Sequence, residues 1–192
     1  RAGDPRPPRR WQAEAYPLVM GAIRARERGV MQACTGAGKT RLTVAVLRTV
    51  LATLRPGWRV VVTVPRQTLV EQTVADAAVA LGRLSVAPWY GGAKKDARVI
   101  VACQDSLGTL NDHLRANRLQ VALWLADECH RSSTDGVLEQ VEAMAPVTRL
   151  GITATPFRSV ESDALLGWDR LVYRYTVDEA IADGVLVPFR LV

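Results

Sequence analysis

The sequence contains no apolar run as long as the 18 or so residues that a membrane-spanning helix needs. Its longest apolar stretches, at residues 60–64 and 121–126, have the length of buried strands. Cysteine is scarce: the chain has 3, and their spacing indicates neither a disulfide framework nor a zinc finger. We therefore expect a protein of a reducing compartment, the cytoplasm, with no membrane partner and no structural zinc.

The rest of the composition is that of an ordinary folded domain. Of 192 residues, 48% are apolar and 23% are charged, which excludes disorder over most of the chain. Lys and Arg number 25 against 19 Asp and Glu, giving a net charge of +6. A basic balance of this size fits a polyanionic partner, although a soluble domain without one often has the same charge.

Strand-like and helix-like segments alternate along the chain. We expect strands at residues 30–33, 58–64, 85–89, 98–102, 120–126, 147–153 and 171–175. We expect helices at residues 10–28, 41–54, 66–81, 109–117, 136–144 and 177–183. Continuous apolar strands separated by amphipathic helices predict an α/β fold, a mostly parallel sheet with helices on both faces. Because no repeat or flexible linker interrupts the pattern, residues 1–192 are expected to form one domain.

A glycine-rich segment after the first expected strand carries the strongest functional signal. This segment, residues 33–40, is named the phosphate loop here because it lies between a strand and a helix, as phosphate-binding loops do. Its candidate ligand residues are Thr35, Gly36, Ala37, Gly38, Lys39 and Thr40. Glycines allow backbone N–H groups to turn toward phosphate oxygens at a helix N-terminus. Lys39 is expected to reach the β- and γ-phosphates, and the Thr40 hydroxyl to bind Mg²⁺.

Two adjacent acids follow the strand expected at residues 120–126. Asp127 and Glu128 would lie at the carboxyl edge of the sheet, where the phosphate loop also opens. There Asp127 is expected to hold Mg²⁺, and Glu128 to polarise an attacking water. An acidic pair alone is more often part of a solvated turn. The pair therefore indicates a nucleotide site only in combination with the phosphate loop.

Three segments in order resemble motifs I, II and III of superfamily 2 helicases and translocases: residues 35–40, 127–130 and 153–156. Residues 65–72, 90–92 and 101–107 are similar to motifs Ia, Ib and Ic, and residues 9–15 to the adenine-recognition segment. The general phosphate-loop pattern has Gly where this chain has Ala33, and Ala is usual there in this superfamily. The Asp-Glu-Cys-His form of motif II and residues 150–158 resemble type I and III restriction motors and DNA repair helicases. The resemblance extends from residue 9 to the C-terminus.

The resemblance implies the first RecA-like lobe of a nucleic-acid helicase or translocase, with DNA as the expected partner and ATP and Mg²⁺ as cofactors. It makes Glu128 and Lys39 the catalytic residues and adds Arg9 and Gln12 to the ATP contacts of the phosphate loop. The implied nucleic-acid contacts are Pro65, Arg66, Gln67, Gly91, Gly92, Gln104 and Ser106. Coupling between the two sites is implied for His130, Thr153 and Thr155.

Some interpretations stay open at this stage. Lys94, Lys95 and Arg98 either add charge beside Gly91 and Gly92 or lie in a solvated turn. Trp11 either stacks near an adenine or packs in the core. Residues 187–192 are typical of a strand in mid-course, so we expect this sequence to be a piece of a longer chain that has a second lobe. Whether nuclease or specificity domains are also fused to it stays open.

Three further functions compete with an unwinding motor. The lobe could belong to a restriction or phage-defence complex that translocates on duplex DNA without unwinding it. It could also be a non-catalytic nucleic-acid-binding module, against which Lys39, Thr40, Asp127 and Glu128 all argue. A signalling GTPase is disfavoured, because the sequence has no N-K-x-D element after a strand. The residues do not distinguish DNA from RNA.

Overall fold

Eight strands form one sheet in the order β4-β3-β5-β2-β6-β7-β1-β8. The computed structural model describes residues 7–132, 134–154 and 167–188. The strands are β1 (Arg28–Ala33), β2 (Trp58–Val64), β3 (Val86–Tyr90), β4 (Ala93–Lys94), β5 (Val99–Cys103), β6 (Gln120–Asp127), β7 (Thr148–Thr153) and β8 (Arg170–Tyr175). Neighbouring strands are parallel except for β3 and β4. The α/β fold with a mostly parallel sheet is therefore confirmed.

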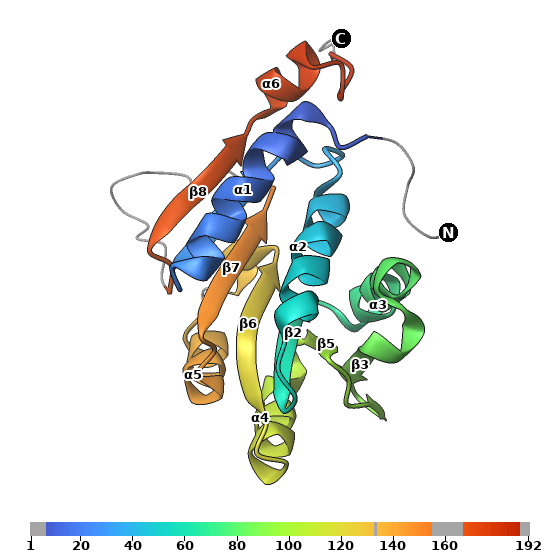
Figure 1. Ribbon diagram of the computed structural model, residues 1–192, viewed down its shortest axis with the longest axis vertical. Coiled ribbons are helices and arrows are strands. Elements are labelled where there is room, and N and C mark those ends of the chain that lie inside the picture. Colours follow the sequence, from blue (N-terminus) through green and yellow to red (C-terminus); the bar gives the residue numbers. More distant parts are fainter. Residues whose placement is uncertain (1–6, 133, 155–166, 189–192) are drawn as a thin grey trace.

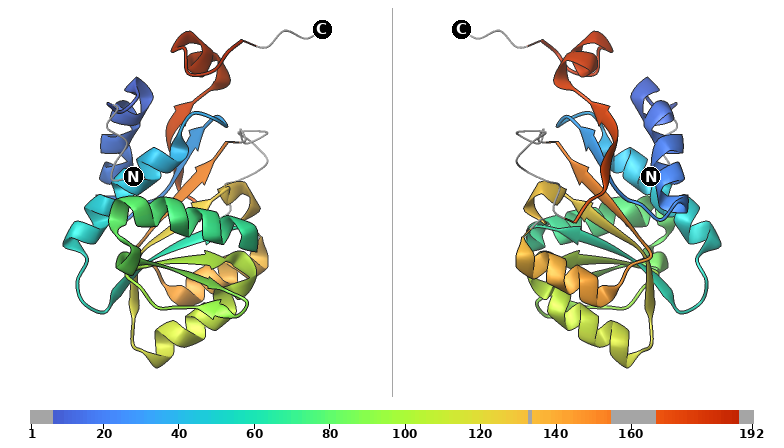
Figure 2. Two further views of the ribbon diagram at one scale, coloured as in Figure 1. Left: turned by 90° about the vertical axis from the view of Figure 1, so that its right-hand side faces the viewer. Right: turned by 90° about the vertical axis from the view of Figure 1, so that its left-hand side faces the viewer.

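Helices cover both faces of the sheet, as Figures 1 and 2 show. On one face lie α1 (Arg10–Arg24), α2 (Lys39–Thr53) and α3 (Gln67–Leu81), and on the other lie α4 (Leu107–Ala116) and α5 (Asp135–Met144). The short helix α6 (Val177–Ala182) follows β8. Within the described ranges, none of the helices combines the length and the apolar character needed to cross a bilayer.

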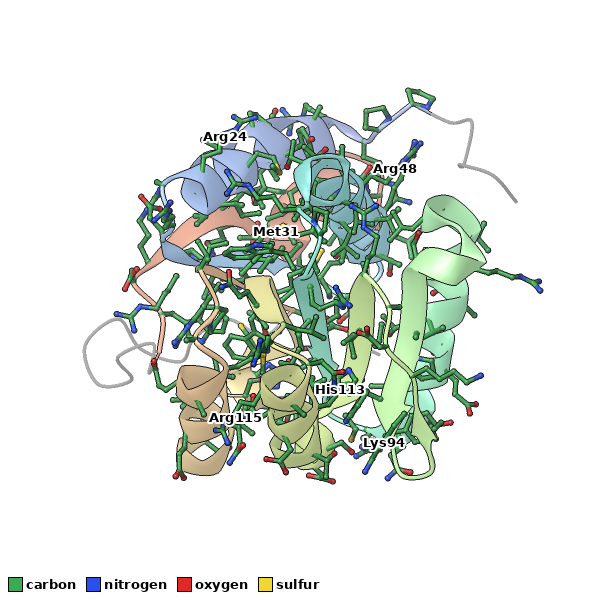
Figure 3. The ribbon with its side chains drawn as sticks, turned by 60° about the horizontal axis from the view of Figure 1, so that its bottom comes forward. Arg24, Met31, Arg48, Lys94, His113 and Arg115 are labelled. Carbon is green, nitrogen blue, oxygen red and sulfur yellow. The ribbon has the colours of Figure 1, made fainter. Side chains whose placement is uncertain are left out.

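Each face of the sheet has its own apolar core. Met31 of β1 lies in the core beneath α1 and α2 (Figure 3), together with the buried ring of Trp11. Trp124 of β6 faces the opposite core and stacks on Trp168 at a ring-centroid distance of 5.3 Å. Two filled faces explain why the central strands are continuously apolar in sequence rather than alternating.

The structure differs from the sequence-based expectations at a few element ends. The first helix ends at Arg24 rather than near residue 28, because Arg26 adopts a left-handed φ of 59° and the chain turns into β1. The sequence pattern does not predict β4, a two-residue antiparallel strand. The strand expected at 187–192 is wrong for Val187 and Pro188, which lie outside any strand, and its other residues lie outside the described ranges.

Gly151 of β7 permits a close approach between this strand and Cys129, the residue that follows the acidic pair. A Cβ atom at this position would lie 2.8 Å from Cys129 Sγ, 2.9 Å from Cys129 Cβ and 3.0 Å from the Trp168 ring. Cys129 is fully buried. The residue after the acidic pair therefore packs directly onto the strand that carries Thr153.

We expect Gly151→Ala to lower the free energy of unfolding by about 1–3 kcal/mol, because an overpacked buried site must shift its neighbours. Gly21→Ala is the matched control: Gly21 lies inside α1, and an added methyl group would meet no atom within 4 Å, so about 0.5–1 kcal/mol should be gained. Denaturant titration followed by circular dichroism measures both. A Gly151→Ala protein as stable as the parent would contradict the close-packing interpretation.

Candidate functional site

The candidate site lies along the carboxyl edge of the sheet, the upper edge in Figure 1 toward which β6, β7 and β8 point. Strand β1 ends at Ala33, β6 at Asp127 and β7 at Thr153, and β7 lies between the other two. Because the three strands are parallel, the segments that follow them emerge side by side. The tertiary structure thus brings the phosphate loop and the acidic pair to one edge.

The phosphate loop has the backbone geometry of an anion site. Gly36 and Gly38 adopt φ values of 80° and 91°, a region that side chains disfavour. Gly38 directly precedes α2 and has no side chain to cap the first N–H groups of that helix. These N–H groups and the helix dipole favour a negatively charged ligand. The Lys39 ammonium lies beside the loop, where it donates to the Ala33 carbonyl at 3.2 Å.

The first turn of α1 holds the phosphate loop from behind. Arg9 Nη1 lies 2.6 Å from the Ala37 carbonyl oxygen and 3.3 Å from that of Gly36. Gln12 Nε2 donates to the Gly38 carbonyl at 3.0 Å, while its Oε1 accepts from the Arg9 backbone N–H at 2.9 Å. Arg9 and Gln12, the two expected ATP contacts from the adenine-recognition segment, therefore both hydrogen-bond to the loop itself.

A third residue of this turn contacts the loop, and the sequence did not assign it that role. The Trp11 indole N–H donates to the Ala37 carbonyl at 3.2 Å, and the ring is only 1% exposed. Of the two interpretations left open for Trp11, packing in the core is the one the structure supports. Because the two partners are 26 residues apart, no local sequence pattern predicts this contact. The one available signal was that Trp11 directly precedes Gln12, a predicted ATP contact.

The acidic pair sits in a constrained, partly buried turn. The Glu128 backbone N–H donates to Asp127 Oδ1 at 3.1 Å, and Glu128 adopts a left-handed φ of 52°. Burial raises the pKa of Asp127, the Glu128 charge raises it further, and the nearby Lys39 charge opposes the rise. Burial likewise raises the pKa of the Cys129 thiol to about 12, so this thiol is a packing group.

His130 and Thr153, two of the residues expected to couple the sites, are in contact. His130 Nδ1 lies 2.9 Å from Thr153 Oγ1 and 3.4 Å from Glu128 Oε2. Thr153 is fully buried at the end of β7. A polar path thus runs from the acidic pair to the strand that leads toward Thr155, which itself lies outside the described residues.

The expected nucleic-acid residues follow β2, β3 and β5 at the same edge. Pro65 is half-buried, whereas Arg66, Gln67, Gly91 and Gly92 are exposed. Ser106 is buried, and Gln104 Nε2 donates to Ser132 Oγ at 2.7 Å, which links this surface to the segment after the acidic pair. Lys94 and Lys95 are exposed beside the Gly91–Gly92 turn. Arg98 instead bonds the Leu51 carbonyl at 2.5 Å near the C-terminus of α2, at the opposite edge.

The segment that builds this edge is shared with a known protein family. The family model described as type III restriction enzyme, res subunit, matches residues 6–158. The chain belongs to this family. The match includes the phosphate loop, the acidic pair and β7, so the site described above is the part of the chain that the res-subunit family shares.

One curated relative and two solved structures are similar to this chain. The chain is 34% identical over 73 residues to the Escherichia coli type I restriction enzyme EcoAI endonuclease subunit, covering 36% of this chain and 9% of that one. Its fold is similar to that of the type ISP restriction-modification enzyme LlaGI, solved as a nuclease-deletion mutant with a DNA substrate mimic (TM-score 0.74, 14% identity, 94% of this chain, 21% of that one). The Pyrococcus furiosus Hef helicase domain is also similar in fold, with a TM-score of 0.67 and 22% identity. That match covers 88% of this chain and 38% of the Hef chain.

The family match together with these likenesses bears out the predicted superfamily 2 RecA-like lobe. The chain spans about a tenth of the EcoAI subunit and about a fifth of LlaGI. Residues after 158, including β8 and α6, lie beyond the res-subunit match.

The left-handed backbone of Glu128 yields a stability prediction. A side chain in this conformation costs about 1–2 kcal/mol, whereas glycine adopts it freely at an entropic cost of about 0.5–1 kcal/mol. We expect Glu128→Gly to unfold at the same or a higher denaturant concentration than the parent. Arg131→Gly, at an exposed position in the same turn but without positive φ, should unfold at a lower concentration. Equal losses in both variants would show that the turn at Glu128 is unstrained.

Proposed function

We propose that this chain is the ATP-binding lobe of a nucleic-acid helicase or translocase, with DNA as its track. The observation that carries the proposal is the juxtaposition at one sheet edge of the phosphate loop, Lys39 and the acidic pair. A phosphate loop by itself indicates only a nucleotide. Asp127 and Glu128 lie at the end of β6, which is separated from β1 by one strand in the sheet. They supply the carboxylates that nucleotide hydrolysis requires.

A hollow beside the phosphate loop has room for the nucleoside. It has a volume of about 650 Å³ and is lined by residues of α1, α2 and α3, among them Gln12, Tyr16, Thr40 and Arg48. Arg48, which is labelled in Figure 3, belongs to α2 and lines this hollow. We assign the base and ribose to it because Thr40, the residue after Lys39, is among the residues that line it.

The donor set also fits Mg²⁺. Thr40 offers a hydroxyl and Asp127 a carboxylate, and Mg²⁺ is usually held by one or two such oxygens together with substrate phosphates and waters. The described residues hold no group of three or more His, Cys, Asp or Glu side chains placed to bind a metal by themselves. The ion would neutralise phosphate charge, while Glu128 orients and polarises the water and Lys39 binds phosphate oxygens.

The nucleic-acid surface is assigned to the exposed loops after β2 and β3. Backbone amides and small residues such as Gly91 and Gly92 suit contacts with phosphate and sugar, which carry no sequence information. The DNA substrate mimic bound by LlaGI supports DNA as the partner. The family match also favours a second candidate, a restriction-complex motor that moves along duplex DNA without unwinding it.

We further propose that turnover needs a second RecA-like lobe. In phosphoryl transfer an arginine finger contributes about 10³–10⁵ in rate, and motors of this superfamily take it from the second lobe. The solved relatives are longer than this chain, which leaves room for that lobe and for fused domains. Residues 1–192 alone are then expected to bind ATP weakly and to hydrolyse it negligibly.

Nucleotide binding is tested by calorimetric titration of Mg-ATP. We expect Lys39→Ala to weaken affinity about tenfold or more, because a hydrogen bond to a charged group is worth about 1.5–3 kcal/mol. Glu128→Gln should retain affinity within a few-fold, since the amide keeps the shape of the carboxylate. Arg24→Ala, an exposed cation at the far end of α1, is the charge-matched control. Unchanged affinity in Lys39→Ala would refute the phosphate-loop assignment.

Nucleic-acid binding should be weak, independent of sequence and steeply dependent on salt, because each phosphate neutralised by Lys or Arg releases counterions. Fluorescence anisotropy with two unrelated duplexes and the corresponding single strands, over a salt series, measures this. Arg66→Ala should reduce the salt slope equally on all of them, whereas Arg115→Ala on α4 should not. Strong preference for one sequence would contradict a surface that grips the backbone.

A further inference from the structure

The carbonyl groups of the phosphate loop are turned toward the first turn of α1, and side chains of that turn hold them. The Ala37 carbonyl accepts from both Arg9 at 2.6 Å and the Trp11 indole at 3.2 Å. The next carbonyl, of Gly38, accepts from Gln12 at 3.0 Å. Two successive peptide groups of the loop are therefore fixed by side chains about 26 residues away.

Fixing a carbonyl also fixes the N–H group of the same peptide. The peptide unit is planar and trans, so its C=O and N–H point in opposite directions. With the Ala37 carbonyl held against α1, the Gly38 N–H faces the other way, and with the Gly38 carbonyl held, so does the Lys39 N–H. These N–H groups are at the start of α2, where an anion is favoured. Preorganised donors bind without a reorganisation cost at the moment of binding.

Among the three side chains, Trp11 is the rigid one. It stacks on Tyr175 at a ring-centroid distance of 5.1 Å with 16° between the planes. Tyr175 is itself 2% exposed, and its hydroxyl donates to Asp183 Oδ2 at 3.0 Å. Asp183 in turn pairs with Arg10 of α1 at 2.8 Å. Arg9, by contrast, is an exposed side chain.

We propose that Trp11 is a positioning residue of the nucleotide site: its indole N–H holds the Ala37–Gly38 peptide so that the loop N–H groups face the phosphates. The proposal rests on the proposed function, because it deepens the role of the same loop. It assigns Trp11 to the phosphates and not to the base. Loss of the indole N–H must therefore lower the affinity for every triphosphate ligand by the same factor, whatever base the ligand carries.

The test compares two buried, stacked tryptophans of the 192-residue chain. Trp11→Phe keeps an aromatic ring on Tyr175 but removes the N–H. Trp124→Phe is the matched control: its indole donates to Thr63 Oγ1 at 3.0 Å, and its ring stacks on Trp168 in the core of the opposite face. Affinities for Mg-ATP, Mg-GTP and inorganic triphosphate are measured by calorimetry, and unfolding midpoints by circular dichroism.

We expect Trp11→Phe to weaken all three ligands by a common factor of about 3–10, the size of one lost hydrogen bond. Trp124→Phe should change affinity by less than about twofold while losing comparable stability. Equal effects of the two variants on affinity would make Trp11 merely structural, and a loss confined to ATP would make it a base-reading residue; either result overturns the proposal. If the parent chain binds no triphosphate at all, it is the proposed function that fails.

Arg9→Met provides the second measurement if Trp11→Phe does not fold. Arg9 is exposed and donates to the same Ala37 carbonyl, so its removal leaves the core intact. We expect a smaller loss of affinity, about 2- to 3-fold, again equal for the three ligands. Because Trp11 still holds the carbonyl in Arg9→Met, a small or absent loss that is equal for the three ligands agrees with the proposal. A loss of about tenfold or more, or one confined to ATP, would show that Arg9 or a base contact carries the effect, and the proposal would be overturned.

Discussion

Parallel pairing of β6, β7 and β1 is the constraint on which the rest of this structure depends. In the observed register, Asp127 lies opposite Ile152, and Gln32 lies opposite Thr153. The three strands therefore end at nearly the same level, and the turns that follow them must share one edge. Antiparallel pairing of any one strand would carry its functional turn to the far end of the sheet. A site made from residues 33–40, 127–130 and 153 is a consequence of strand direction.

The same edge combines left-handed backbone conformations with a partly buried acid. Gly36 and Gly38 lie at positive φ, Glu128 does so with a side chain, and Asp127 is an acid whose burial raises its pKa. The two glycines adopt this conformation freely, whereas the backbone of Glu128 and the burial of Asp127 are each unfavourable for stability alone. The surroundings are well packed, as the tight contact of Cys129 with Gly151 shows. A strained residue beside a desolvated acid is common at functional sites.

Two polar contacts link the turn after β6 to neighbouring segments of this edge. His130 links Glu128 to Thr153, and Gln104 links the segment after β5 to Ser132. Both contacts converge on residues 128–132, the short turn after β6. This turn is therefore in contact with the segment after β5 and with the end of β7. The Trp11–Tyr175 stack similarly connects α1 to β8, a strand outside the segment matched by the res-subunit family.

The sequence by itself determined the fold class, nearly all the helices and strands, and the positions of the phosphate loop and acidic pair. It did so because these features are local: apolar periodicity, glycine placement and short motifs are read from neighbouring residues. Only the tertiary structure decided the strand order, the short β4, the capping role of Arg98, the bond from Gln104 to Ser132 and the contact of Trp11 with Ala37. In each of these, the partner lies far along the chain. Which distant groups meet is set by how the strands and helices pack, and that information is carried by the whole core and not by any local pattern.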